Sequence, residues 1–206
     1  MGALIQCCSD EAIKAAGQII RGGGLVVYPT DTLYGLGCSA LDEKAVQRVF
    51  EVKKRDLSNP LSIAVCDLRM LRRYTSFDSR AMRVMGCFLP GPVTFVLRKK
   101  ALPDVLTGGG GSVGVRIPEN RVALKLIMEA GVPIVSTSAN ISGQAPPETA
   151  DEVMAQLPEV DLILDGGKIA GRGSTIIDLT TCPPRILREG AKPAWEVAAV
   201  IEEVYQ

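Results

Sequence analysis

Two short polar clusters, far apart in the sequence, contain residue types that bind phosphate. Lys53-Lys54-Arg55 supplies three cations in a row, and Ser138-Ala139-Asn140 supplies a hydroxyl and a carboxamide in a Ser- and Gly-rich stretch. Lysine offers phosphate a point charge, whereas arginine offers a fork of N–H donors. Each cluster follows an apolar segment that should pack in a core. Together they predict a site for a phosphorylated ligand and favour a nucleotide enzyme over a structural module.

Further polar segments repeat this combination of glycine, hydroxyl and cation. Thr30, Asp31 and Thr32 follow an apolar segment and precede Gly35 and Gly37, which permit close backbone approach. Glycine and hydroxyl residues recur together in Gly108–Ser112 and Gly171–Thr175, and Arg116 and Arg188 are further cations. The structural alternatives are polar turns and cations that complement the dipole at a helix C-terminus. The sequence contains neither G-x-G-x-x-G nor G-x-x-x-x-G-K-[ST], the standard nucleotide-binding motifs.

The chain contains no histidine, and this limits the chemistry that it can perform. Catalysis by Ser-His-Asp or Cys-His groups and histidine–metal chemistry are excluded. A general base must be Asp, Glu, Lys, Tyr, Cys or the substrate itself. The cysteines form no C-x-x-C pair, so we expect several of them to be small core residues in a reducing cytoplasm rather than zinc ligands. They are Cys7, Cys8, Cys38, Cys66, Cys87 and Cys182.

Length and composition indicate a globular protein. The 206 residues fit one domain over 1–206, and 47% hydrophobic with 22% charged residues suffices for a sizeable core. The formal net charge is zero, so no bulk attraction to nucleic acid or acidic membranes is implied, although a local basic groove stays open. No apolar run approaches the ~18 residues of a membrane span, and Met1–Ile5 does not resemble a secretory signal. We therefore expect a cytoplasmic protein without a membrane partner.

Hydrophobic periodicity predicts strands that alternate with helices. The expected helices are 10–20, 42–52, 79–88, 121–129, 151–156 and 195–204. The expected strands are 25–28, 61–65, 93–97, 113–116, 132–135, 162–164, 175–179 and 186–187. Adjacent strand signals predict two antiparallel pairs, 93–97 with 113–116 and 175–179 with 186–187. The pattern therefore predicts an α/β fold with a mixed parallel/antiparallel sheet and helices on both faces.

The aromatic content is too low for a stacking surface that would bind single-stranded nucleic acid. The chain has only nine aromatic residues, four Phe, four Tyr and one Trp. The single tryptophan, Trp195, falls within the last expected helix. We expect it to pack against the core.

The ordered motifs of the chain resemble those of the YrdC/Sua5 family, the threonylcarbamoyl-AMP synthases of tRNA modification. The resemblance runs from about residue 10 to residue 190, and its motifs, each weak alone, are specific in combination. They are Gly24–Gly37, Lys53–Arg55 with Asn59–Leu61, Leu89–Thr94, Val115–Pro118, Ser138–Gly143 and Ser174–Asp178. The resemblance implies a twisted open sheet with a large, basic, concave cavity. The length matches the catalytic domain alone.

The resemblance also implies a reaction. A nucleotidyltransferase of this family makes L-threonylcarbamoyl-AMP and pyrophosphate from L-threonine, bicarbonate and ATP, with Mg²⁺ bound through the ATP phosphates. A transferase complex then moves the threonylcarbamoyl group to an adenosine of tRNA, giving threonylcarbamoyladenosine (t6A). Displacement at the α-phosphorus needs positioning and charge neutralisation more than a strong protein base, which suits a chain without histidine.

The family motifs assign roles to particular residues of this chain. They imply catalytic roles for Lys53 and Arg55. The implied ATP-binding residues are Arg55, Asn59, Ser112, Ser138, Asn140 and Arg188, and the implied threonine-binding residues are Thr32, Arg116 and Ser174. Arg116 is a natural partner for the threonine carboxylate. Many relatives have a histidine where this chain has Ala64 and a serine near Pro146, so one threonine contact and one ATP contact are expected to differ.

Two other functions remain as alternatives. A module that binds double-stranded RNA or tRNA without turnover would show salt-sensitive RNA binding and no consumption of ATP. A carbamoyl transferase like the related domain of hydrogenase maturation proteins would use carbamoyl phosphate. Those proteins carry an acylphosphatase-like domain and zinc-finger cysteine pairs, which this sequence lacks.

Overall fold

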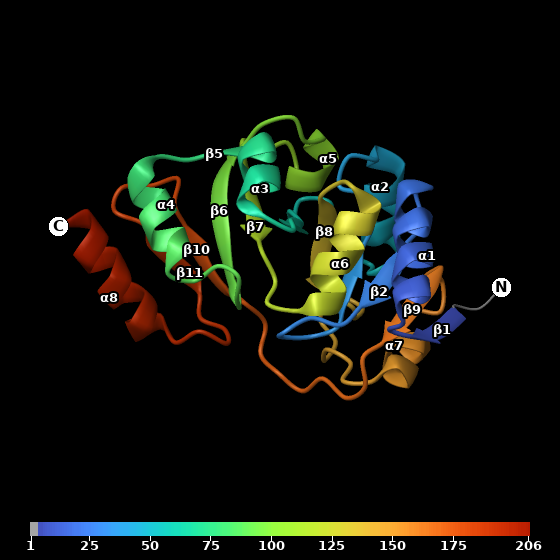
Figure 1. The fold of residues 1–206 in the computed structure, drawn as a ribbon. Coiled ribbons are helices and arrows are strands. Elements are labelled where there is room, and N and C mark those ends of the chain that lie inside the picture. The colour runs from blue at the N-terminus through green and yellow to red at the C-terminus, as the bar shows by residue number, and fades with distance from the viewer. Residues whose placement is uncertain (1–3) are drawn as a thin grey trace.

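A computed structural model describes residues 4–206, within which eleven strands and eight helices alternate (Figure 1). The strands are β1 (Leu4–Cys7), β2 (Val26–Tyr28), β3 (Gly35–Gly37), β4 (Ser62–Ala64), β5 (Thr75–Ser76), β6 (Val93–Lys99), β7 (Ser112–Arg116), β8 (Ile134–Ser138), β9 (Leu162–Asp165), β10 (Thr175–Asp178) and β11 (Arg185–Arg188). The helices are α1 (Asp10–Arg21), α2 (Glu43–Val52), α3 (Leu68–Tyr74), α4 (Ser79–Gly86), α5 (Asp104–Thr107), α6 (Arg121–Ala130), α7 (Ala150–Gln156) and α8 (Ala194–Tyr205). None of the helices in this range is long and apolar enough to cross a membrane.

All the described strands belong to one mixed sheet. The order is β1-β9-β2-β3-β8-β4-β7-β6-β10-β11, and β5 pairs separately with β6. Four pairings are parallel, namely β1 with β9, β2 with β9, β4 with β7 and β6 with β10. The two predicted antiparallel pairs, β6 with β7 and β10 with β11, are confirmed. The predicted α/β fold with a mixed sheet is therefore confirmed.

Helices cover both faces of this sheet, and the alternation of side chains along a strand separates two cores. In β2, Val27 joins a core with side chains of α2, α4, α7 and α8, whereas Val26 and Tyr28 join a second core with α1 and α6. Successive strand residues point to opposite faces, which explains this division. Helices α1 and α6 lie side by side at one end of the sheet, and α4 and α8 lie at the other end (Figure 1).

Helix α2 ends in a turn that separates the cations that follow it. The N-terminal cap is Asp42, whose carboxylate accepts the N–H groups of Lys44 and Ala45. At the other end Lys54 has a φ of 49°, in the left-handed region. The N–H of Lys54 donates to Glu51 O and that of Arg55 donates to Phe50 O, the two hydrogen bonds of a Schellman motif. The chain therefore turns sharply between Lys53 and Arg55.

Several elements differ from the sequence expectations. Strands β1, β3 and β5 and helices α3 and α5 were not predicted, because they are short or contain residues, such as the glycines of β3, that are depleted in regular elements. Strand β8 begins two residues later than expected and continues through Ser138. The stretch Ser136–Ser138, expected as a polar loop, is strand because Ser136 pairs with Ser62 and Ser138 pairs with Gly35.

Trp195 and most of the cysteines lie nearer the surface than expected. Trp195 is 72% exposed in the first turn of α8, because Val197 and Ile201 are the residues of that helix that face the core. The prediction that Trp195 packs in the core is wrong. Among the cysteines, Cys38 is buried and the other five are half-buried or exposed. The expectation of several core cysteines therefore holds for Cys38 alone. All six cysteines are free thiols.

Candidate functional site

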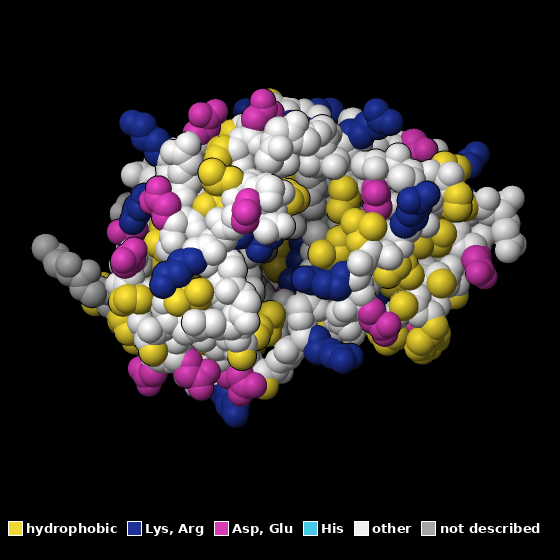
Figure 2. All heavy atoms as spheres, turned by 180° about the vertical axis from the view of Figure 1, so that it is seen from behind, with side chains coloured by type: hydrophobic (Ala, Val, Ile, Leu, Met, Phe, Trp, Pro, Cys, Tyr) yellow, Lys and Arg dark blue, Asp and Glu magenta, His cyan; other side chains and the backbone are white. Residues whose placement is uncertain are grey.

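The middle strands of the sheet carry a polar cavity of about 230 Å³ on one face. It is lined by three arginines, Arg55, Arg116 and Arg188, and by many hydroxyl side chains. The hydroxyl residues are Thr30, Thr32, Tyr34, Ser62, Thr94, Ser136, Thr137, Ser138 and Ser174. No lining residue within the described part of the chain is acidic. Figure 2 shows a hollow in the middle of the molecule with Lys and Arg side chains in and beside it. The site therefore suits an anionic ligand.

The register between β4 and β8 places serines in the cavity. Ser62 of β4 lies opposite Ser136 of β8, and both line the cavity. Two residues along, Ala64 lies opposite Ile134, and both belong to the core beneath α1 and α6. Residues two apart on a strand share a face. The same face of β4 and β8 therefore packs in the core at Ala64 and Ile134 and lines the cavity at Ser62 and Ser136.

The same face continues across β7, β6, β10 and β11. Thr94 pairs with Ile176, and Ile176 pairs with Arg188, so these three lining residues cross the sheet side by side. Gly114 lies between Ser62 and Thr94, where a Cβ atom would lie 2.4 Å from Ser62 Oγ. The absence of a side chain at Gly114 therefore keeps the floor of the cavity open.

Arg116 is the most buried of the three arginines, with a side chain 7% exposed. Its Nε donates to Gly91 O at 3.0 Å and its Nη1 donates to Thr32 Oγ1 at 2.9 Å. Its Nη2 donates to the carboxylate of Asp31. These three contacts use three of the five N–H groups of the guanidinium, so two remain for a ligand.

A local turn at Thr30 presents Asp31 and Thr32 to Arg116. Thr30 Oγ1 accepts the N–H groups of Thr32 and Leu33 at 3.1 Å each and donates to Leu33 O at 2.6 Å. A threonine side chain that bonds to the backbone two and three residues ahead fixes a tight turn. The next two side chains can therefore both reach the guanidinium.

Arg55 and Arg188 are held at the cavity by backbone carbonyls. Arg55 donates from Nε to Asn59 O and from Nη2 to Pro60 O, each at 3.0 Å. Arg188 donates from Nη2 to Ser174 O at 2.8 Å. Partial burial lowers the pKa of both guanidinium groups from the ordinary value. Because their partners are neutral, both arginines remain electrostatically available to an anion.

Lys53 is buried and does not line the cavity. Its exposed fraction is 2%, and its ammonium donates to Ser138 O and, at 2.7 Å, to Asn140 O. Its own carbonyl accepts the N–H of Ser142 at 2.8 Å. Burial, with the nearby charge of Arg55, lowers the pKa of Lys53 to about 7. The contacts of Lys53 therefore fasten the end of α2 to the segment that follows β8.

The segment after β8 is shaped by its own polar side chains. Ser138 Oγ donates to Asn140 Oδ1, and Asn140 Nδ2 donates to Ile141 O at 3.0 Å and to Gln144 O at 2.7 Å. Asn140 is buried and absent from the cavity lining, whereas Ser138 is part of it. The Lys53 and Asn140 contacts together hold Ser138 in place at the cavity.

The structure brings together only part of the predicted site. The predicted residues that line the cavity are Thr32, Arg55, Arg116, Ser138, Ser174 and Arg188. Those outside the lining are Lys53, Asn59, Ser112 and Asn140. Asn59 is exposed and serves Arg55 through its carbonyl, and Ser112 is half-buried opposite Arg98. Ala64, expected at the threonine pocket, lies in the core instead.

Sequence reasoning missed Ser62 and Thr94 as lining residues, and it singled out Ser136 and Thr137 only as part of the polar stretch 136–143. The signal that could have revealed Ser62 and Thr94 is the period of two along β4 and β6, once the strand pairing is known. Within residues 4–206 no cluster of three or more His, Cys, Asp or Glu side chains is placed to hold a metal ion.

Comparison with known proteins places this cavity in a family context. The family profile described as "Telomere recombination", which covers Sua5, YciO and YrdC, matches residues 18–190. The threonylcarbamoyl-AMP synthase of Pyrococcus abyssi is 43% identical over 196 residues, which are 93% of this chain and 58% of that protein. The uncharacterized protein YciO of Escherichia coli K12 is 35% identical over 88% of this chain and 90% of its own length.

A solved structure agrees with the fold. The structure of P. abyssi Sua5 complexed with L-threonine matches with a TM-score of 0.91 and 41% identity, over 98% of this chain and 60% of that chain. The chain thus spans about three fifths of the length of this relative.

Proposed function

The chain belongs to the Sua5, YciO and YrdC family, and we propose that it is a threonylcarbamoyl-AMP synthase. It would convert L-threonine, bicarbonate and ATP into L-threonylcarbamoyl-AMP and pyrophosphate. The product would pass to a transferase complex for the t6A modification of tRNA. One observation carries the proposal, namely a concave cavity in which three arginines and many hydroxyl groups meet and in which none of the described lining residues is acidic.

The residues of the cavity suit the charges of these substrates. Arg116 has two free N–H groups at the buried end of the site and would bind the threonine carboxylate. Arg55 and Arg188, bonded only to neutral carbonyls, would bind ATP phosphates and neutralise the charge that develops at the α-phosphorus. Lys53 would act by holding Ser138 in position.

The lining also fits a magnesium ion that arrives with its nucleotide. The described lining residues offer hydroxyl oxygens and no carboxylate, so they provide no strong protein ligand set for the ion. Mg²⁺ bound through the ATP phosphates would therefore enter as part of the substrate. When bound there it would neutralise phosphate charge alongside the arginines.

The relatives of this chain differ in length and in name. The synthase of P. abyssi is longer than the present chain, whereas the E. coli relative of similar length is named only as the uncharacterized YciO. The chemistry must therefore be tested on this chain.

The test is pyrophosphate release from ATP and Mg²⁺, with threonine and bicarbonate each added or omitted. We expect release only when both are present. Arg188→Ala should lower the rate roughly 10²-fold, by analogy with removal of one preorganised donor at an oxyanion. Arg185→Ala, in the same strand but outside the cavity lining, is the matched control and should leave the rate unchanged. Release that ignores threonine or bicarbonate would contradict the proposal.

Binding of RNA without turnover is the alternative that the arginines also permit. It predicts no pyrophosphate release in any combination and an affinity for double-stranded RNA that falls steeply with salt. The two functions are separated by measuring both pyrophosphate release, which reports turnover, and RNA affinity, which reports binding. The same Arg188→Ala and Arg185→Ala pair serves in both assays.

A further inference from the structure

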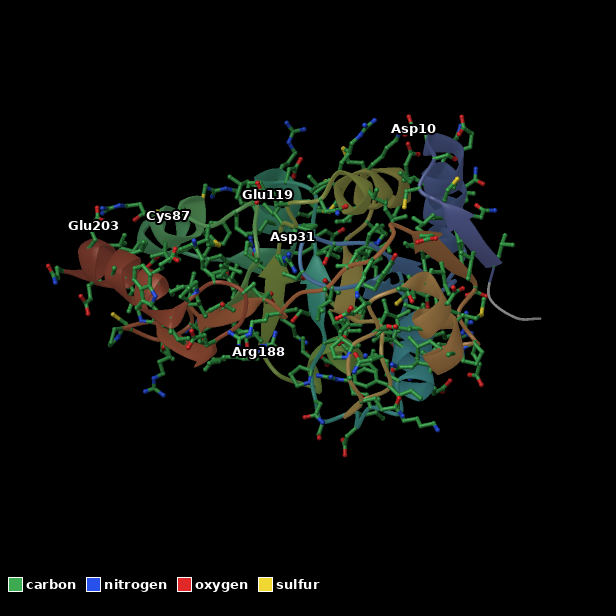
Figure 3. All side chains as sticks on the ribbon, turned by 90° about the horizontal axis from the view of Figure 1, so that it is seen from below. Asp10, Asp31, Cys87, Glu119, Arg188 and Glu203 are labelled. Atoms are coloured by element: carbon green, nitrogen blue, oxygen red, sulfur yellow. The ribbon has the colours of Figure 1, made fainter. Side chains whose placement is uncertain are left out.

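Asp31 is the only carboxylate bonded to the cavity's arginines within the described residues. Its Oδ1 accepts from Arg116 Nη2, whereas the hydrogen-bond partners of Arg55 and Arg188 are backbone carbonyls. Asp31 is not itself among the residues that line the cavity, but its side chain, 14% exposed, contacts the lining residue Arg116. In Figure 3, Asp31 and Arg188 both lie in the middle part of the molecule.

We propose that Asp31 and Arg116 together recognise an α-amino acid, Arg116 binding its carboxylate and Asp31 binding its ammonium. This inference rests on the proposed function and identifies the residue that selects the amino acid. An α-amino acid carries its two opposite charges on groups attached to the same carbon atom. The contact between Asp31 and Arg116 places two opposite charges side by side in the same way. When the amino acid binds, its two charges and those of Asp31 and Arg116 alternate in sign, so each charge lies beside opposite charges and is attracted to them.

The charged groups that line the cavity are poor partners for an ammonium. Within the described residues they are all guanidiniums, which repel it. The buried ammonium of Lys53 is another cation and is already bonded to two carbonyls. Within the described residues only Oδ1 of Asp31 is hydrogen-bonded, which leaves Oδ2 for a ligand. Asp31 is thus the carboxylate available to offset the ammonium.

A purely structural role for Asp31 makes a different prediction. If Asp31 only orients Arg116, its loss weakens every carboxylate ligand to the same degree. If Asp31 binds the ammonium, its loss weakens threonine and spares an analogue in which a hydroxyl replaces the ammonium. The ratio of the two affinities in one protein therefore separates the roles, and it is insensitive to a general loss of stability.

The experiment is titration calorimetry of the full chain with L-threonine and with 2,3-dihydroxybutanoate, its hydroxyl analogue. Wild type should prefer threonine by roughly 10- to 100-fold, as expected for a hydrogen bond between charged groups. Asp31→Asn should abolish this preference. Thr32→Val, which removes the neutral side-chain partner of Arg116, should weaken both ligands and keep the ratio. Asp104→Asn, at an exposed ion pair with Lys99, is the charge-matched control and should change neither.

Each outcome has a distinct meaning. Wild type that binds both ligands equally, or Asp31→Asn that keeps the preference, overturns the role of Asp31 and leaves the proposed function standing. Wild type that binds no threonine overturns the proposed function and this inference with it. If circular dichroism shows that Asp31→Asn does not fold, Asp31→Ser is the second neutral variant for the same ratio.

Discussion

The buried ammonium of Lys53 should make the stability of the protein depend on pH near neutrality. Burial lowers its pKa from 10.5 to about 7 in the folded state. Between these two values the unfolded chain binds a proton that the folded chain does not bind. The free energy of unfolding therefore rises with pH over this range and reaches its full gain above the unfolded pKa. Below pH ~7 the burial penalty on the charged form is fully present.

The size of the effect follows from proton linkage. From about pH 7 to about pH 8.5, a shift of this size raises the free energy of unfolding by about 1.6 kcal/mol. The range ends at about pH 8.5 so that it stays below 9.0, the ordinary pKa of a thiol in the unfolded chain. Burial raises the pKa of Cys38 in the folded state from 9.0 to about 12. A thiol whose folded pKa is raised loses stability as pH increases above its unfolded pKa, which would oppose the lysine effect.

The assay is urea unfolding followed by circular dichroism across this pH range, for wild type and for Lys53→Met. Methionine fills a similar volume, carries no charge and has no group to titrate. The variant should therefore lose the increase with pH, so the difference between the two proteins should change by about 1.6 kcal/mol. A difference that stays constant would show that the ammonium keeps its charge throughout, and the reasoning from burial would be wrong.

Three further predictions concern the floor, the buried arginine and the helix before the site. Gly114→Ala should lower the free energy of unfolding in urea by about 1–3 kcal/mol, because its Cβ would clash with Ser62 Oγ. Adding Ser62→Ala should restore part of that free energy. If the effects of the two substitutions simply add, the clash is contradicted. Arg116→Lys should weaken threonine binding by calorimetry at least ~10-fold, because lysine lacks the fork; equal affinity would argue against bidentate binding. Asp42→Ala should cost about 1 kcal/mol of stability by loss of the α2 cap, whereas Glu43→Ala, with no cap bond, is the control.

The elements that position the site were predictable where the signal is local. The helix over 42–52 follows from apolar residues at helical spacing after a capping aspartate, and α2 matches it closely. Arg55 and Ser138, which follow apolar segments in the sequence, both line the cavity. Arg116 and Arg188, each at the end of a short strand, line it as well.

The shape of the cavity could not be predicted from the sequence, because it depends on the pairing of strands that are far apart in the chain. Ser62 and Ser136 are neighbours only because β4 pairs with β8, and a shift of one residue would bury both. Nothing within either segment specifies that partner. The glycine-rich β3 completes the same region of the sheet, although its composition argues against a strand.

The run Lys53-Lys54-Arg55 shows why residue type alone does not assign a role. Three adjacent cations suggested one phosphate site, but the turn at Lys54 gives each a different environment: Lys53 is buried, Lys54 is exposed and Arg55 lines the cavity. Helical periodicity ends where the helix ends, so it carries no information about these directions. A loss of activity in a Lys53 variant would therefore reflect displacement of Ser138, which its ammonium holds, as well as any loss of charge. A direct role for Lys53 at the phosphates stays a prediction, and comparing Lys53→Met with Ser138→Ala in the pyrophosphate assay would separate the two effects.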